Sequence, residues 1–227
     1  MEASSNPRAD PRHALPARYP FDLVDVWHTS DGERVLIRPV HAQDLELVQA
    51  FVRELSPESR YNRFHGAVKE LTPGMARWAT HVDYDRHMAL IAVVFADGNQ
   101  QDGREIEIGA ARYAVSADGE TAEFAVAVAD AWQGRGVGAR LLRGLIEVAA
   151  RRGLRWMEGD VLATNRGMRA LARKLGFQSR ARGGEARLVR VSRILRSEDA
   201  RSAARVAARP GWRGLFGMLR AGPSSAA

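Results

Sequence analysis

The sequence predicts a mixed α/β (α+β) domain in which helices flank a central, mostly antiparallel sheet. Three observations support this prediction. Short apolar runs alternate with apolar stripes at helical spacing from about residue 33 to residue 195. The turn signal Asp118-Gly119 joins two of these runs directly, as in antiparallel neighbours. The chain of 227 residues, 45% of them apolar, is long enough to bury one sizeable core.

The elements up to residue 64 follow from apolar spacing and helix-start signals. Residues 35–39 form a short apolar run that is typical of a strand. Apolar residues at every third or fourth position predict a helix over 42–55. In the segment SPESRYNRF, Ser56 is a good N-cap and Pro57 fits the first turn, so a second short helix begins there.

The middle of the chain contains three further strand candidates, over 88–95, 106–116 and 122–128. The second and third are separated only by the short turn noted above. No segment between these three runs is long enough for a crossover helix. They are therefore predicted to form a meander of adjacent antiparallel strands.

The elements after residue 136 alternate between helix and strand. A helix with one apolar face is predicted over 137–149, followed by a strand over 154–162. A short helix over 166–174 leads to a last pair of strands, over 177–180 and 186–194.

The two ends of the chain differ in composition from this domain. Residues 1–20 hold four prolines among small and polar residues, so we expect a disordered tail and a folded domain over 21–196. Residues 197–227 are basic and rich in alanine, arginine and glycine. Apolar residues from Trp212 to Leu219 lie at helical spacing, which predicts a short amphipathic helix that docks on a partner, on an anionic surface or, as we favour, loosely on its own domain.

Composition limits the compartment and the kinds of partner. The chain has no cysteine, which excludes disulfides and thiolate chemistry and indicates a reducing, cytoplasmic compartment. No apolar run is long enough to span a membrane, and the first residues contain no secretion signal. The net charge of +7 comes almost wholly from arginine, but acids are interspersed through most of the chain, so nucleic-acid binding is not expected.

The segment DAWQGRGVGARLL, residues 130–142, is the main functional signal. Gly134, Gly136 and Gly138 allow the backbone to approach a ligand closely, and a predicted helix begins at their end. The first amides of that helix are unsatisfied donors at the positive end of its dipole. This arrangement predicts a site for a diphosphate.

Two other phosphate motifs fit the segment less well. A P-loop requires Lys and then Ser or Thr after its last glycine, but Ala139 and Arg140 follow here. The dinucleotide pattern Gly-x-Gly-x-x-Ala is satisfied from Gly134 to Ala139, with Glu158 and Asp160 near the place of the ribose-binding acid. However, several residues separate the preceding strand from the first glycine, and too little chain follows for a second half of that fold.

Residues 133–138 match the Gln/Arg-x-x-Gly-x-Gly/Ala signature of the GNAT (Gcn5-related) N-acetyltransferases. With Asn165 and the Leu-Gly-Phe of residues 175–177, the chain resembles that superfamily over roughly residues 33–195. The segments SPESRYNRF, AEFAVAVADAWQGRGVG and GDVLATNRGMRALARKLGF look like the bacterial protein lysine acetyltransferases. In longer relatives of that group, the catalytic domain is joined to an acyl-CoA synthetase-like domain, for which this chain has no room.

The resemblance implies the GNAT fold, in which two strands splay apart at the acyl-CoA cleft. The strand ending at Val128 would diverge from the strand over 154–162, and the pantetheine would lie between them. The diphosphate would lie on the amides of the glycine turn, and an asparagine would contact the cofactor near its thioester. The residues that the resemblance assigns to cofactor binding are Val126, Ala127, Val128, Gln133, Gly134, Arg135, Gly136, Val137, Gly138, Ala139 and Asn165.

Glu123 is the predicted general base. Transfer of an acyl group to a lysine requires a neutral amine, whereas the lysine pKa is about 10.4, so a carboxylate must accept a proton. Strand alternation places Glu123 on the face opposite Phe124, beside small residues, and the resemblance assigns a glutamate to this strand. Glu158 and Asp160 are the alternatives. The simplest competing interpretation of Glu123 is a solvated side chain at a strand edge.

The remaining candidates are weaker. Many GNAT enzymes carry a tyrosine that reprotonates the thiolate, but Ala172 occupies that position here. The histidines have no metal-ligand spacing, and no Gly-x-Ser-x-Gly elbow is present, so we expect direct transfer without a metal. Asn165 also fits a plain helix cap. Tyr61 and Arg63 are candidates for the acceptor side, although packing of a short helix explains them equally well.

Three functions remain open from the sequence. The first is an N-ε-lysine acetyltransferase that uses acetyl-CoA and acts on proteins, such as acyl-CoA synthetases. The second is acetylation of a small-molecule amine. The third is a non-catalytic acyl-CoA sensor or a nucleic-acid-binding module. The sequence leaves the acceptor, the acyl length, the regulator and the oligomeric state open.

Overall fold

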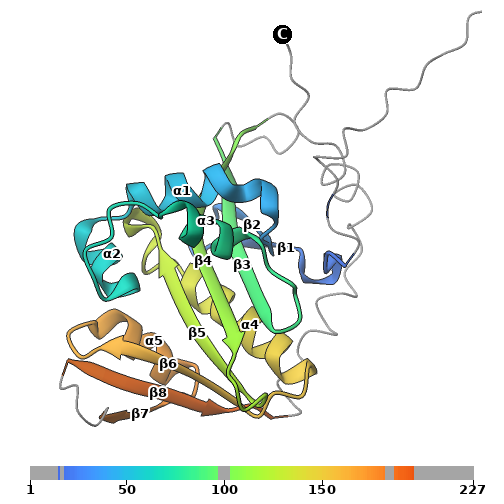
Figure 1. Cartoon of the computed structure of the whole chain (residues 1–227). Coiled ribbons are helices and arrows are strands. Elements are labelled where there is room, and N and C mark those ends of the chain that lie inside the picture. Colours follow the sequence, from blue (N-terminus) through green and yellow to red (C-terminus); the bar gives the residue numbers. More distant parts are fainter. Residues whose placement is uncertain (1–14, 16–17, 97–102, 182–186, 197–227) are drawn as a thin grey trace, which may run out of the picture.

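The computed structural model describes residue 15 and residues 18–96, 103–181 and 187–196. These residues form a mixed α/β fold around one sheet of eight strands in the order β1-β2-β3-β4-β5-β6-β8-β7 (Figure 1). Every neighbouring pair is antiparallel except β5 with β6. The strands are β1 (Asp25–His28), β2 (Arg34–Pro39), β3 (His87–Phe95), β4 (Glu105–Val115), β5 (Thr121–Val128), β6 (Trp156–Leu162), β7 (Gln178–Ala181) and β8 (Leu188–Ile194).

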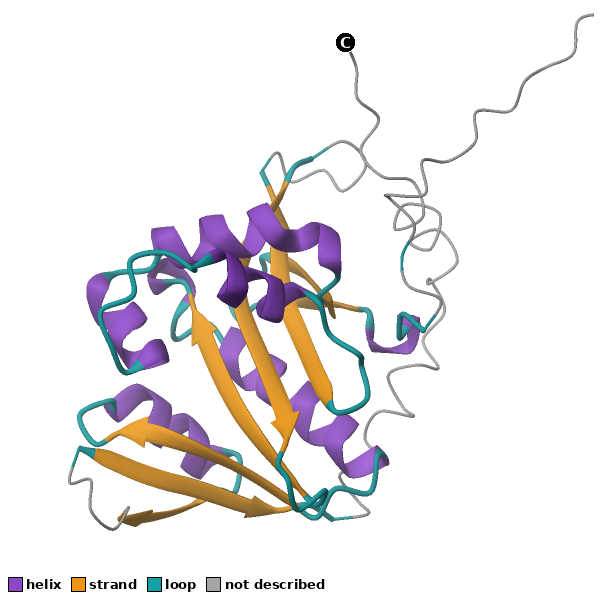
Figure 2. Cartoon of the chain, in the orientation of Figure 1, coloured by secondary structure: helices purple, strands orange, loops and turns teal. Residues whose placement is uncertain are grey.

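The helices divide between the two faces of the sheet (Figure 2). Gly109 on β4 faces α4, because an added Cβ would meet side chains of that helix at 3.1 and 3.2 Å. Arg112 on the same strand faces the other way and donates to Ala79 O of α3. We call these the α4 face and the α3 face. The helices are α1 (Leu45–Glu54), α2 (Pro57–Phe64), α3 (Pro73–Thr80), α4 (Val137–Arg151) and α5 (Arg166–Lys174), with short 3-10 turns over Phe21–Leu23, Ala42–Asp44 and Asp130–Trp132.

The core on the α4 face is apolar. Helix α4 places one continuous stripe against the sheet, and Leu141, Leu142 and Leu145 are each fully buried. Burying one such side chain contributes about 1.5–3 kcal/mol. This helix also connects β5 to β6, and a crossover of this kind is what allows two consecutive strands to run parallel.

The elements predicted from the sequence are present with small changes of boundary, and two were missed. Strand β1 is only four residues long and gives little periodic signal. Helix α3 begins with signals that the sequence does contain: Thr72 Oγ1 accepts from Met75 N, and Pro73 occupies the first turn. The packed domain also begins earlier than residue 21, because Tyr19 is 4% exposed and donates to Pro39 O. The predicted segment 197–227 lies outside the described residues.

Candidate acyl-CoA and acceptor site

The central feature of the site is a divergence between β5 and β6. The two strands pair only over Thr121–Glu123 with Trp156–Glu158, and they have no register beyond Glu123. Figure 1 shows them separating from this point. Since β6 pairs with β8 along its whole length, the second half of β5 keeps one edge of its backbone unpaired by any described strand.

The unpaired edge exposes the backbone of alternate residues. Ala129 N donates to Ile108 O on β4, so the Val128 carbonyl on the other side of that trans peptide faces the gap. Gln133 Nε2 donates to this carbonyl at 3.1 Å. By alternation Val126 also faces the gap, whereas the backbone of Ala127 faces β4. Of the three predicted backbone contacts, Val126 and Val128 are therefore the ones oriented toward a ligand in the gap.

The glycine turn has the geometry that a diphosphate site needs. Gly134 and Gly136 have φ values of +76° and +94°, in the left-handed region that favours glycine. Gly136 is the N-cap of α4, and the first backbone bond of the helix runs from Arg140 N to Gly136 O. The amides of residues 137–139 precede that bond and have no partner within the helix. These residues fit a diphosphate at the positive end of the helix dipole.

The third glycine of the turn has a packing role. A Cβ on Gly138 would meet Leu171 of α5 and Val128 of β5, both at 3.4 Å. The absence of a side chain therefore lets α4 pack closely against both elements. Val137 and Ala139 are buried beside it, so they can offer only backbone amides to a ligand.

The β1–β2 hairpin covers the glycine turn, which the sequence did not indicate. Trp27 lies against Gly136, where a Cβ would be 3.2 Å from the indole ring. Arg140 pairs with Asp25, and Arg135 Nη1 pairs with Asp31 at 3.1 Å while its guanidinium lies 4.9 Å from the Trp132 ring. Arg135 thus has a protein partner and is positioned beside the turn.

Hydrogen bonds also hold the turn to helix α2. Asp130 accepts from Ser56 N, Ser56 Oγ and Ser59 Oγ at 2.7–2.9 Å, which lowers the pKa of Asp130. Gln133 Nε2 donates to Ser59 Oγ as well as to Val128 O. Gln133 therefore fixes the turn relative to α2 and β5. The cap of α2 is itself as predicted, with Ser56 Oγ accepting from Ser59 N.

Asn165 is the N-cap of α5, and its Oδ1 accepts from Met168 N at 2.9 Å. The simple capping interpretation of this residue is correct, and its side-chain amide is still free to donate. Ala172, at the position of the missing tyrosine, is fully buried. It therefore presents no proton donor to the gap.

Glu123 is exposed on the α3 face of β5, at the last residue pair before the strands diverge. Its cross-strand neighbour is Ala114, and Ala125 follows it on the same face. No described side chain forms a hydrogen bond or an ion pair with its carboxylate. Phe124 is buried on the other face, and Val126 and Val128 pack partly against the core, as alternation predicted.

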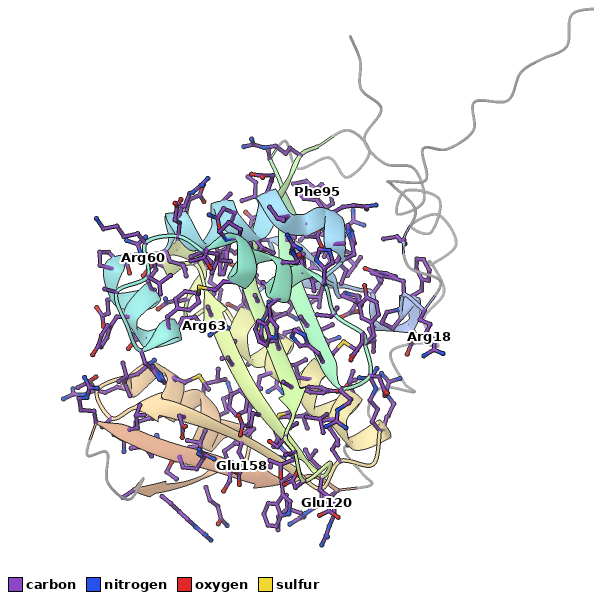
Figure 3. The ribbon with its side chains drawn as sticks, viewed as in Figure 1. Arg18, Arg60, Arg63, Phe95, Glu120 and Glu158 are labelled. Carbon is purple, nitrogen blue, oxygen red and sulfur yellow. The ribbon has the colours of Figure 1, made fainter. Side chains whose placement is uncertain are left out.

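The two alternative carboxylates are already paired. Glu158, which Figure 3 labels, lies on β6. It is directly opposite Glu123 in the parallel pairing of β5 with β6. Arg190 Nη1 donates to Glu158 at 2.9 Å, and the same guanidinium contacts Asp160 at 2.6 and 3.0 Å. Oxygens of both carboxylates are thus already engaged in charge-assisted hydrogen bonds. Glu123 is therefore the better candidate for the base.

The α3 face also carries buried charged groups that the sequence did not single out. Arg112 is 6% exposed, and its guanidinium lies 4.8 Å from the Trp78 ring, which also stacks on His87. Glu107 is 3% exposed, and burial raises its pKa to about 8. A bulge in β4 places Glu107 on the same face as Arg112. No spacing in the sequence reveals this cluster, because it depends on strand register.

Three further observations concern a cavity, metal ligands and membrane-spanning helices. A cavity of about 1110 Å³ lies at the beginnings of β5 and β6. It is lined by residues such as Thr121, Trp156, Lys174 and Glu158, the neighbour of Glu123, but by no residue of the glycine turn. Within the described part of the chain, no group of histidines and acids is arranged to hold a metal ion. None of the described helices is long and apolar enough to cross a membrane.

Comparison with known proteins agrees with this geometry. The profile of the Acetyltransferase (GNAT) domain matches residues 34–178. Acetyltransferase PA5475 of Pseudomonas aeruginosa is 41% identical over 155 residues, which cover 67% of this chain and 81% of that protein. Acetyltransferase Pat of Mycolicibacterium smegmatis is 32% identical over 146 residues, which cover 64% of this chain and only 41% of that protein.

Among solved structures, the GNAT domain of S. lividans PAT superposes with a TM-score of 0.70 and 29% identity. The match covers 78% of this chain and all of that domain. An open sheet that splays beside a glycine turn defines an acyltransferase of the acyl-CoA-dependent type. The chain belongs to the GNAT acetyltransferase family, whose members use acetyl-CoA.

Proposed function

We propose that this protein transfers an acetyl group from acetyl-CoA to the ε-amine of lysine residues in proteins, with Glu123 as the general base. The observation that carries the proposal is the position of Glu123, an unpaired carboxylate where β5 and β6 begin to diverge. The likeness to S. lividans PAT and M. smegmatis Pat supports a protein acceptor. Acyl-CoA synthetases are the acceptors that the sequence resemblance suggests.

The geometry supports the following proposed roles for the residues. The amides of residues 134–139 bind the diphosphate, and the backbone edge of Val126 and Val128 pairs with the pantetheine. The Asn165 amide contacts the cofactor near its reactive end. On the α3 face, Glu123 accepts, directly or through water, the proton that the lysine ammonium must lose before its nitrogen can attack.

The reaction is then a direct transfer. After Glu123 has taken one proton from the ammonium, the neutral amine nitrogen forms a bond to the acetyl carbon and the carbon–sulfur bond breaks. The second proton that the nitrogen loses passes to water. The thiolate leaves without help from the position of Ala172, so water or another group protonates it. No acyl-enzyme is needed.

The proposed compartment is the cytoplasm, which the absence of cysteine from the sequence favours.

Incubation of the protein with acetyl-CoA and an extract of cells lacking deacetylases tests the proposed acceptor. Mass spectrometry should find lysines acetylated above the level produced by a Glu123→Gln control. Acetylation of small amines without any protein target would instead support a small-molecule acetyltransferase. Binding of acetyl-CoA with no transfer to either class would support a sensor.

A further inference from the structure

The α3 face of the sheet carries four arginines that differ in their partners. Arg38 contacts Asp44 and Glu105, and Arg190 contacts Glu158 and Asp160. Each of these two guanidiniums is therefore compensated by two carboxylates.

Arg63 and Arg112 have no such compensation. No described carboxylate forms an ion pair with either of them. Arg112 donates through Nη2 to Ala79 O at 3.0 Å, but its Nη1 is buried without a hydrogen-bond partner. Arg63, at the last turn of α2, lies 4.9 Å from the Phe64 ring and contacts no other charged group directly. Figure 3 shows Arg63 near β5.

The charge of Arg63 acts on Arg112. Burial, and then the nearby charge of Arg63, lower the pKa of Arg112 to about 9, while burial lowers that of Arg63 to about 10. Glu107 is the acid whose charge would raise the pKa of Arg112. However, both of its oxygens are unpartnered, and burial makes it largely neutral at pH 7. Buried charge without a partner is unfavourable, and this applies to Arg112, whereas Arg63 is only half-buried. An anionic ligand beside Arg63 would compensate both cations.

Sheet register places Arg112 near the proposed base. Arg112 is directly opposite Ala125, two residues after Glu123 on the same face. Diagonal neighbours of this kind have Cα atoms about 7–8 Å apart. Ala110, Ala125 and Ala127 share this face, and their small side chains are only half-buried. The diphosphate turn belongs to the far end of β5 and to α4, so the cofactor phosphates are a poor match for these two arginines.

We propose that Arg63 and Arg112 bind a carboxylate of the acceptor and so select amines that carry a carboxylate close to the reacting nitrogen. The inference rests on the proposed function, because it assumes that the acceptor approaches Glu123 from the α3 face. A guanidinium pair suits a carboxylate because it offers several parallel N–H donors. The carboxylate belongs either to the main chain of an amino acid or to an acidic residue beside the target lysine.

Matched acceptors test this inference on the full-length protein. Nα-acetyl-lysine and Nα-acetyl-lysine amide share one ε-amine and differ by one carboxylate. A second pair, short blocked peptides with Asp or Asn beside the lysine, distinguishes the two sources. In the pair whose carboxylate comes from the source that the arginines recognise, kcat/KM should be about 10-fold to 100-fold higher for the acceptor that carries the carboxylate.

The variant Arg63→Gln should remove most of that preference by raising KM for the carboxylate-bearing acceptor, with KM for acetyl-CoA unchanged. Arg63→Lys should restore part of it. Arg53→Gln is the matched control, because Arg53 is an exposed arginine on neighbouring α1 that pairs with Glu70. Thermal unfolding of each variant establishes that it is folded.

Calorimetry with the CoA-bound protein separates this inference from the proposed function. Binding of a carboxylate-bearing acceptor that is lost in Arg63→Gln, without any transfer, would support the arginine site and contradict the proposed function. Transfer at equal kcat/KM within both pairs, or a preference that survives Arg63→Gln, would overturn the arginine site and leave the function standing. Failure of all four acceptors to bind would also overturn it.

Discussion

The two faces of the sheet are built from different kinds of side chain. On the α4 face, leucines and valines of the helix fill the space against β3, β4 and β5. On the α3 face, the same strands carry Arg112, Glu107 and Glu123. Both faces bury apolar residues, since Val48, Phe51 and Val52 of α1 are buried on the α3 face, but these charged groups of the site lie on the α3 face. Changes to the leucines of α4 should alter the free energy of unfolding, whereas changes to the charged groups should alter kinetics or pH dependence.

The largest expected effect is on the α3 face. Glu123→Gln should lower kcat by about 10²-fold to 10⁴-fold, because the amine loses its proton acceptor. The thermal midpoint and the affinity for acetyl-CoA should stay as in the wild type, since Glu123 is exposed and has no partner among the described residues. A thiol-release assay measures kcat, titration calorimetry measures the affinity for acetyl-CoA, and thermal unfolding measures the midpoint. Glu120→Gln, two residues after Asp118 of the turn, is the control and should keep the activity of the wild type. Full activity in Glu123→Gln would refute the assignment of the base.

The matching variant on the α4 face is Leu145→Ala. It should lower the free energy of unfolding by about 2–5 kcal/mol, because it leaves a cavity in a fully buried site. Denaturant unfolding measures this loss. At a temperature where the variant is still folded, its kcat and both KM values should equal those of the wild type. A specific loss of kcat would mean that the two faces are not separate in function.

Glu107→Gln tests the titration of the Glu107 carboxyl group, which is buried on the α3 face. Burial raises the pKa of Glu107 from 4.5 to about 8, so between these values the folded chain holds a proton that the unfolded chain has lost. The stability that this group contributes is complete below pH 4.5 and is lost as the pH rises toward 8. Gln cannot ionise, so the variant should gain stability over the wild type as the pH rises, by about 3 kcal/mol at pH 7. Parallel stability–pH curves for the two proteins would contradict this account.

The smallest expected effect concerns the glycine turn, at the end of the sheet where the two faces meet. Gly136→Ala should cost about 1–2 kcal/mol of stability because of the positive φ, and should also raise KM for acetyl-CoA. The added Cβ would press on Trp27 and shift the amides that begin α4. Gly153→Ala is the matched control, since Gly153 has a similar φ but open space around it. An equal effect of both variants on KM would mean that the turn does not bind the cofactor.

The two parts of the site differ in how far the sequence could predict them. The glycine turn is contiguous, and its glycines, the following helix and the Asn165 cap all carry local signals that the structure reproduces. The α3 face is assembled from residues far apart in the chain. Arg63 comes from α2, Trp78 from an unpredicted helix, and Arg112 is brought near Glu123 only by the register of β4 with β5.

Register and burial are also the reasons for the other differences. The bulge that turns Glu107 onto the α3 face, and the hairpin that brings Trp27 onto Gly136, both depend on contacts between distant segments. The pairing of Glu158 and Asp160 with Arg190 likewise needs the β6–β8 register. Local patterns predict elements, but they do not tell which side chains meet across a sheet.

The central claim is that β5 and β6 hold the cofactor between them with its thioester end toward Glu123. A crystal structure of the protein with CoA tests this claim most directly. We predict that the diphosphate contacts the amides of residues 134–139 and that the sulfur lies in the gap, within reach of an acceptor beside Glu123. CoA bound in the cavity near Trp156 and Lys174, or a sulfur on the α4 face away from Glu123, would contradict the account.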